Sequence, residues 1–435
     1  MMKPLGSGQT VFALLMTVIV LARHAWGGSD LRLSPEDFTY EGAFKLEEIW
    51  KPNYETWEYS NAPIAYYPTG DPNGSNDGYP GSLFVAGHVY RSLVAEMAVP
   101  KPVISKNIEQ LNTAGFLQNF KDVLAPIPLK AGQITGMTYL SAQGQQSRGK
   151  IYFCITTDYQ DIDRPAPSLG WFDTNLATPN SAGAWFLGNE LVWNTCRYAT
   201  TIDPNWANQH TPEKLLATGR MRQSWGIANG PNLYASAPWA DGNPPEPNAR
   251  LSSWKTLMRF GASAPIDSKK YSDSDAYRGA AWLTSGGKTA VAITALKDID
   301  STRAYYGHEN WETPNQCESL GTCKGQRGHR CGNCRASILL FDPADLAAVA
   351  NGAAQSYQPQ WYARVDINDY MIHSYGPTFL STGAEAETLS ATYDLARGLL
   401  YVSESYADSA KPIVHVFRVT ASRNSQTSSI VPTSP

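Results

Sequence analysis

The sequence has little that would build a helical, membrane-spanning or multi-domain protein. Long apolar helical patterns are nearly absent, and the clearest apolar run, residues 11–22, has 12 residues, too few to cross a bilayer of about 30 Å as a helix. No low-complexity stretch separates two halves, although 435 residues would by length suggest two or three domains. These absences favour one large domain built from short strands.

The first 27 residues read as an export signal. Lys3 supplies the positive start, residues 11–22 the apolar core, and Ala25 and Gly27 the small side chains that signal peptidase reads. The alternative is an uncleaved N-terminal anchor. We expect residues 28–435 to be a secreted or periplasmic domain with no membrane contact once the signal is removed.

Basic residues are too few for a nucleic-acid-binding protein. Of 35 Lys and Arg, 33 remain without Lys3 and Arg23, against 39 acidic residues, whereas phosphate binding needs clustered cations. A weakly acidic protein still binds an anionic sugar where a few arginines converge.

What the sequence does contain is a repeated strand pattern. Three stretches share a small residue with an aromatic one, a polar turn and a strand of β-forming residues. They begin at Thr138-Tyr139, at Ala281-Trp282 and at Thr392-Tyr393. Each continues into a third strand, at 169–173, 338–342 and 413–417. Two further units are indicated at 81–99 and 232–260.

Such antiparallel units stack radially, because none buries both of its faces alone. We therefore expect an all-β single β-propeller with long inter-strand loops, and prefer seven blades to six. A β-sandwich with long loops is the alternative. Residues 38–44 are predicted to pair into the last blade and close the ring. One short helix is predicted at 343–351, with Asp342 as N-cap.

Six cysteines in an exported chain indicate disulfides. Cys154 and Cys196 are isolated and can pair with each other. The other four are crowded in one glycine-rich insertion: Cys317, Cys323, Cys331 and Cys334. Two disulfides would staple it, and a tetrahedral structural zinc site is the equally weighted alternative, since thiolates at this spacing suit zinc.

In a propeller, equivalent strand ends gather on one face around the axis. The ends that follow the second strands carry histidine, tyrosine and carboxylate side chains: His88, Tyr159, Tyr234, Tyr306, His308 and Glu404. Arg250 and Arg278 are close to these strands in sequence. Each of these residues alone is typical of an ordinary structural position. Together they indicate a functional site, because the fold would bring them to one face.

The set suits β-elimination of a uronic-acid polysaccharide. That reaction needs a cation to neutralise the carboxylate, a base to remove the C5 proton and an acid for the leaving oxygen. Hydrolysis would need two opposed carboxylates, and carboxylates are few among these candidates.

Three sequence segments, at 82–88, 134–139 and 340–346, resemble segments of a group of secreted bacterial β-propeller proteins. In architecture that group is similar to the seven-bladed ulvan lyases, which cleave a sulfated algal polysaccharide. The resemblance implies catalysis by His and Tyr with an Arg neutraliser, and zinc in some members. His88 is the residue whose strand-end setting is similar.

The expected function is a polysaccharide lyase acting on an acidic, ulvan-like glycan. His88 and Tyr234 or Tyr159 would serve as base and acid, with Arg250 as neutraliser. Tyr306, His308, Arg278 and Glu404 would bind substrate. The alternative is a non-catalytic propeller that binds a glycan or a protein. A metal-dependent hydrolase or oxidoreductase using His308 and His373 is a third possibility.

Overall fold

The computed structural model describes most of the chain after the predicted export signal. The described residues are 31–49, 52–129, 132–156, 165–220, 230–261, 264–265, 267, 269–272, 275–299, 303–305, 329–331, 333–373 and 389–421, with the backbone alone at 303–305 and 329–331. Within them no helix is both long and apolar enough to cross a membrane. The signal predicted at 1–27 lies outside this part of the chain.

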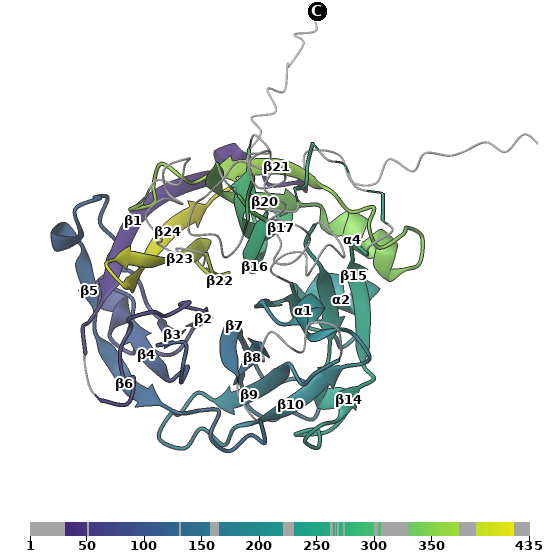
Figure 1. Cartoon of the computed structure of the whole chain (residues 1–435), viewed down its shortest axis with the longest axis horizontal. Helices are drawn as coiled ribbons and strands as arrows, with labels where there is room; N and C mark the ends of the chain where they lie inside the picture. Colours follow the sequence, from purple (N-terminus) through teal and green to yellow (C-terminus); the bar gives the residue numbers. More distant parts are fainter. Residues whose placement is uncertain are drawn as a thin grey trace, which may run out of the picture.

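Five blades, each of four antiparallel strands, surround a central axis and form a β-propeller (Figure 1). Blade 1 consists of β2 (Ile64–Tyr67), β3 (Ser82–Ala86), β4 (Val94–Ala98) and β6 (Phe116–Lys121). Blade 2 consists of β7 (Gln133–Leu140), β8 (Lys150–Thr156), β9 (Leu169–Asp173) and β10 (Ala182–Leu187). Blade 3 consists of β11 (Tyr198–Thr201), β12 (Leu216–Gly219), β13 (Leu233–Ser236) and β15 (Trp254–Met258).

The last two blades complete the ring. Blade 4 consists of β16 (Ala276–Ser285), β17 (Lys288–Asp298), β20 (Cys334–Phe341) and β21 (Trp361–Asp366). Blade 5 consists of β22 (Ala391–Asp394), β23 (Leu399–Asp408), β24 (Lys411–Val419) and β1 (Phe38–Leu46). The innermost strands β2, β7, β11, β16 and β22 contact one another in a closed cycle. The core therefore lies between neighbouring blades.

The prediction of seven blades is wrong, and the all-β propeller is right. The five units marked in the sequence are the five blades; the remaining length forms connections. The stretch from β17 to β20 and the stretch from β21 to β22 are the clearest cases, since each runs for more residues than a strand pair needs. The number of blades therefore depends on how many residues the connections take up, and no local sequence pattern predicts that number.

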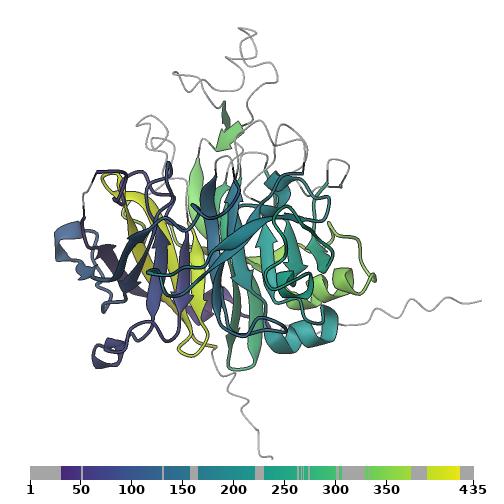
Figure 2. The same cartoon turned by 90° about the horizontal axis from the view of Figure 1, so that it is seen from below.

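Each blade alternates strand direction, so the propeller has two distinct faces. The second strands end on the face turned to the viewer in Figure 1, here called the upper face; the hairpin β18 (Arg303–Tyr305) and β19 (His329–Cys331) projects from it (Figure 2). The innermost strands end on the lower face, where α2 (Pro204–His210) and α4 (Pro343–Ala350) lie (Figure 2).

The remaining helical segments are short connections. They are α1 (Val192–Thr195) and the 3₁₀ turns η2 (Pro35–Asp37), η3 (Gly74–Asn76), η4 (Ile108–Gln110) and η6 (Pro238–Ala240). The predicted helix is confirmed as α4: Asp342 caps it by accepting the Ala344 N–H at 2.8 Å, and Pro343 occupies its first turn.

Ring closure by the N-terminal strand is also confirmed. β1 pairs antiparallel with β24 from Phe38 opposite Val419 to Lys45 opposite Ile413. Two short strands then tie neighbouring blades together. β5 (Asn112–Ala114), which lies between β4 and β6 in sequence, pairs in parallel with β1 of blade 5, and β14 (Arg250–Leu251), which lies between β13 and β15, pairs in parallel with β10 of blade 2.

Glycine allows the innermost strands to approach closely. Gly136 in β7 and Gly279 in β16 both follow a β-bulge. A Cβ at Gly136 would lie 2.6 Å from the Cα of Tyr198, and one at Gly279 would lie 2.5 Å from the backbone N of Ala391. Both contacts are with the innermost strand of the next blade, so larger residues would push blades apart.

The predicted pairing of Cys154 with Cys196 is wrong: both are free, buried cysteines. The Thr135 hydroxyl lies beside both, 3.7 Å from the Cys154 Sγ and hydrogen-bonded to the Cys196 carbonyl. Burial raises the pKa of Cys196 to about 11 and that of Cys154 well above its usual range. Both thiols are therefore packed, protonated core side chains.

Candidate functional site

His88 lies where the sequence analysis placed it, just past the end of β3 on the upper face. Its backbone N–H donates to the Thr56 carbonyl at 3.1 Å, and the residue forms an isolated bridge with Ser60. The residue is 8% exposed. The 52–60 segment before β2 therefore holds His88 in place.

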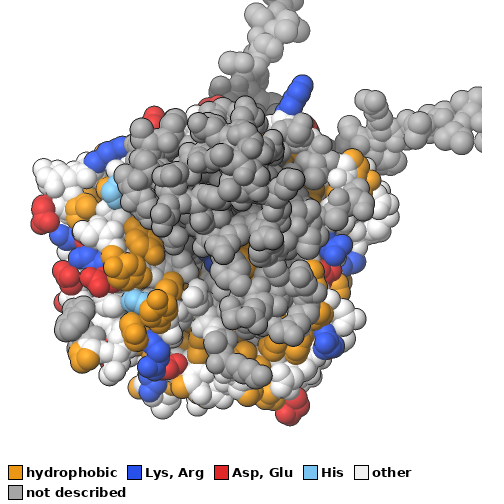
Figure 3. All heavy atoms as spheres, viewed as in Figure 1, with side chains coloured by type: hydrophobic (Ala, Val, Ile, Leu, Met, Phe, Trp, Pro, Cys, Tyr) orange, Lys and Arg blue, Asp and Glu red, His pale blue; other side chains and the backbone are white. Residues whose placement is uncertain are grey.

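Three exposed tyrosines surround His88 and form what we call the tyrosine platform. The ring centroids of Tyr54, Tyr59 and Tyr90 lie 4.7, 5.6 and 4.9 Å from that of His88. Their exposed fractions are 44%, 51% and 71%. Figure 3 shows hydrophobic side chains gathered around a histidine on the left of the upper face, over blade 1. Such a group of exposed aromatic rings is a candidate interaction surface.

The platform is built on unfavourable backbone. Tyr54 and Tyr59 have φ angles of 65° and 54°, in the left-handed region that non-glycine residues rarely adopt. Tyr406, whose ring centroid lies 6.2 Å from that of Tyr59, has φ 58° and reaches the platform from blade 5. Each such residue costs about 1–3 kcal/mol, and strain of this kind concentrates at functional sites.

A backbone hydrogen bond selects the state of the His88 imidazole. Nδ1 accepts the Tyr90 N–H at 3.1 Å, so the neutral ring carries its proton on Nε2. Within the described part of the chain no acceptor binds Nε2. Partial burial lowers the pKa of His88, opposed by the Glu58 carboxylate nearby. His88 therefore offers a neutral N–H donor beside the tyrosine rings.

The charges next to the platform are mostly balanced. Arg91 donates to Asp122 at 2.7 Å in an exposed ion pair. Glu58, half-buried, adds one carboxylate close enough to act on His88. Together these three side chains carry one net negative charge.

The structure does not place Tyr234 or Arg250 beside His88. Tyr234 lies in β13, the third strand of blade 3, where it is fully buried and donates to Glu190 at 3.2 Å. Arg250 is on the outer edge of blade 2, stacked 4.5 Å from the Phe186 ring centroid and donating to the Gly188 carbonyl at 2.8 Å. The second strand of blade 3, which ends on the upper face, is β12, and the residue that follows it is Arg220.

Glu404 and Arg278 are buried and away from solvent. Glu404, fully buried in β23, contacts Nε2 of His415 at 2.8 Å and accepts the backbone N–H groups of Ile372 and His373. The other ring nitrogen of His415 contacts the Tyr40 hydroxyl at 3.0 Å. Arg278 is 2% exposed in β16. The side chains joined to Glu404 tie β1, β23 and β24 together within blade 5.

The remaining predicted site residues lie largely outside the described residues. Tyr159, Tyr306, His308, Cys317 and Cys323 are among these, together with the side chain of Cys331. Cys334 is buried and disulfide-bonded. Within the described residues no group of three or more His, Cys, Asp or Glu side chains could hold a metal ion. Because its sulfur is in a disulfide, Cys334 is not available as a thiolate ligand, so the disulfide alternative fits the four-cysteine insertion better than zinc.

The platform tyrosines carry no strand or strand-end pattern in the sequence. Tyr54 and Tyr59 precede the first innermost strand, in a segment without strand periodicity, and Tyr90 lies in the turn after His88. The available signal was the density of aromatic residues in Tyr54-Glu55-Thr56-Trp57-Glu58-Tyr59.

Comparisons with known proteins identify no family for this chain. No protein-family model matches the chain, and no curated protein matches it. A solved structure described as that of the Dos1 propeller is similar at 7% sequence identity and a TM-score of 0.27. The match covers 78% of this chain and 64% of that one, so this chain spans less than two thirds of its length.

Proposed function

We propose that this protein is a glycan-binding β-propeller whose tyrosine platform stacks on a neutral sugar. The observation that carries the proposal is the cluster of three exposed tyrosine rings around His88. Two of these tyrosines are held on left-handed backbone, at a cost that simple surface residues would not retain.

The geometry of the rings favours a stacked ligand over an enclosed cation. Neighbouring ring centroids lie only 4.7–5.7 Å apart across Tyr54, His88, Tyr90 and Tyr59. These distances are those of rings packed against each other, which leaves no space between them for an ammonium group. An open aromatic surface instead suits the apolar C–H face of a pyranose.

The polar groups around the platform suit sugar hydroxyls. The phenol hydroxyls both donate and accept, the His88 Nε2–H donates, and Glu58 accepts. The ion pair between Arg91 and Asp122 leaves no excess positive charge here. A neutral glycan fits this balance better than the acidic polysaccharide expected from sequence.

A β-elimination lyase is the second candidate. The observation that favours it is the contact of His88 with tyrosine rings, because tyrosine and histidine are the acid–base groups of that chemistry. The His88 Nδ1 is already an acceptor for the backbone, so a tyrosine hydroxyl of the platform would have to act as the base.

The test is binding to a panel of neutral and acidic polysaccharides. We expect Tyr59→Ala and Tyr90→Ala each to weaken binding of a neutral glycan about tenfold, equivalent to about 1.4 kcal/mol. Tyr370→Ala is the matched control, because Tyr370 is 41% exposed and packs on Tyr40 outside the platform. Equal binding by wild type and a Tyr54, Tyr59, Tyr90 triple alanine variant would refute the proposal.

The same mixtures of protein and polysaccharide also test the second candidate, the lyase. Ultraviolet absorbance from an unsaturated uronate, appearing in wild type and lost in the triple variant, would establish elimination. Binding without absorbance on every uronic-acid polysaccharide would remove the lyase and leave the binding function.

A further inference from the structure

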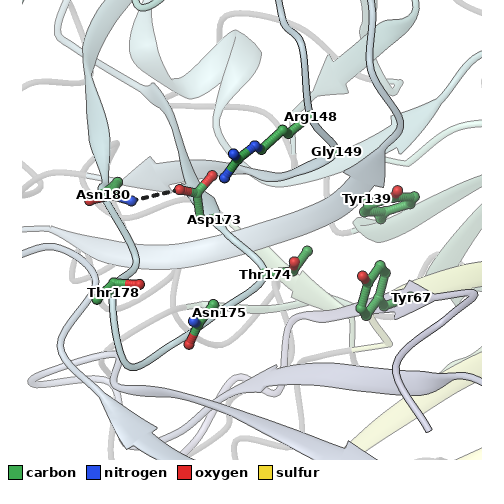
Figure 4. Close-up of a pocket in the computed structure, with 9 residues that line it drawn as sticks. All are labelled: Tyr67, Tyr139, Arg148, Gly149, Asp173, Thr174, Asn175, Thr178 and Asn180. Atoms are coloured by element: carbon green, nitrogen blue, oxygen red, sulfur yellow. Dashed lines mark hydrogen bonds between the residues drawn. The ribbon is translucent and has the colours of Figure 1, made fainter. Parts of the chain in front are cut away.

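A second candidate site lies on the lower face, between blades 1 and 2. It is a pocket of about 290 Å³ (Figure 4). Tyr67 ends β2, Tyr139 is near the end of β7, and Asp173 ends β9. These strand ends place the pocket on the face opposite the tyrosine platform, so the two sites share no residue.

One wall of the pocket is aromatic. The rings of Tyr67 and Tyr139 lie 5.0 Å apart at an interplanar angle of 54° and stand at the same side of the pocket in Figure 4. Gly149 makes the approach of Tyr139 possible, because any side chain there would overlap the phenol. Burial raises the pKa of Tyr139, with a smaller contribution from Tyr67. Its hydroxyl is therefore a neutral donor.

The opposite wall is polar and held in place. Asp173 is ion-paired with Lys150 and accepts the Asn180 side-chain N–H at 2.8 Å. Asn175 accepts the Ala177 N–H at 3.0 Å, which orients its amide. In Figure 4 these side chains stand across the pocket from Tyr67 and Tyr139. An aromatic wall facing fixed amides and a carboxylate matches the two sides of a sugar ring.

The charge of the pocket selects the kind of sugar. Lys150 and Asp173 neutralise each other, which leaves the guanidinium of Arg148. In the described part of the chain Arg148 forms no ion pair, and it points toward Asp173 and Asn180 in Figure 4. A guanidinium is the side-chain group best suited to a carboxylate, because its planar N–H groups match the two carboxylate oxygens.

We infer that this pocket binds a single monosaccharide unit that carries a carboxylate. The ring would stack on Tyr67 and Tyr139, its hydroxyls would bond Asn175, Asn180 and Asp173, and its carboxylate would pair with Arg148. The volume of about 290 Å³ is just below the range of about 300–1,000 Å³ usual for ligand pockets, which suits one ring. The inference goes beyond the platform and does not depend on it.

The test uses the whole protein and three small probes: methyl glucuronide, methyl glucoside and acetate. We expect the glucuronide to bind at least tenfold tighter than the glucoside and to shift the NMR signals of Tyr67 and Tyr139. Arg148→Gln should abolish the preference, and Tyr139→Leu should weaken the glucuronide severalfold. Arg91 is an exposed arginine on the upper face. The control substitution Arg91→Gln should change neither the preference for the glucuronide nor the affinity for it.

The outcomes separate this inference from the proposed function. Binding of the glucuronide that survives the platform triple alanine variant supports the lower pocket, even if no neutral glycan binds the platform. Equal affinity for acetate and glucuronide, or an unchanged preference in Arg148→Gln, would overturn the inference.

Discussion

The His88 imidazole accepts the Tyr90 N–H at Nδ1, and this contact controls what the residue offers a ligand. Protonation would place two N–H groups against each other, which agrees in direction with the lowered pKa. A sequence shows that a histidine follows a strand. It does not show which ring nitrogen a backbone amide occupies, because that depends on the turn geometry of residues 88–92.

We predict that His88 titrates below the usual histidine pKa of about 6.5. Because the folded state binds this proton more weakly than the unfolded chain, the contribution of His88 to stability is complete above about pH 6.5. It declines as the pH falls from there to the folded-state pKa. NMR titration of the assigned imidazole and pH-dependent unfolding measure both effects. A midpoint at or above 6.5, or the same pH dependence in His88→Gln, would contradict the prediction.

A second residue-scale prediction concerns the free cysteines. Cys154 and Cys196 are buried, with the pKa of Cys196 raised to about 11. The thiolate is the reactive form, so native protein treated with iodoacetamide at pH 8 should leave both unmodified. Peptide mapping by mass spectrometry reads the result. The same protein unfolded in guanidinium is the control, and rapid native alkylation of either cysteine would show that its burial is not maintained.

At the scale of strands, the sequence predicts strand positions well where residues alternate and poorly where they do not. The hairpin of β16 and β17 turns on Gly286 and Gly287, which have φ angles of 54° and 84° as a two-residue turn requires. This pattern was recognisable. In blade 3, β11 and β12 have four residues each and are separated by α2, too short for a periodic signal. Tyr234, which the sequence predicts at the end of a second strand, lies instead within the third strand, β13.

The closing strand supplies an element-scale prediction. Gly42, at the bulge of β1, has φ 122°, and a Cβ there would lie 2.5 Å from the backbone of Val103. Gly42→Ala should lower the free energy of unfolding by about 3 kcal/mol, from backbone strain and steric overlap together. Gly287→Ala is the matched control: its φ is 84°, but nothing lies within 4 Å.

Gly287→Ala should cost only about 1 kcal/mol, from backbone strain alone. Urea-induced unfolding of the two variants and wild type measures the difference. If both substitutions cost the same, the close approach of Gly42 to Val103 does not constrain the strand.

At the scale of the whole molecule, closure of the ring pairs residues about 370–380 positions apart in sequence, from Phe38 with Val419 to Lys45 with Ile413. β1 contributes Ala43, Phe44 and Leu46 to buried clusters and a charged contact between Glu41 and Arg418. Closure was predictable because a propeller must not leave its last blade with an open edge. The blade count was not, because it depends on how many residues the connections take up.

Removal of residues 28–49 should therefore destabilise the entire ring. Loss of the buried Phe44 and Leu46 side chains alone predicts a fall of about 5 kcal/mol in the free energy of unfolding. A synthetic peptide of residues 28–49 added to the truncated protein should restore thermal stability in a concentration-dependent way. A peptide with Phe44→Asp is the control. Wild-type stability after truncation would show that β1 does not hold the ring closed.

The pairing of β1 with β24 also sets how the molecule responds to force. Phe38, where β1 begins, lies opposite Val419, where β24 ends. A load applied through the two chain ends therefore acts at one end of an antiparallel pair and separates its hydrogen bonds one after another. Strands loaded in this peeling direction yield at low force. A propeller anchored by one terminus and pulled by the other would open at blade 5 first, with four blades still folded.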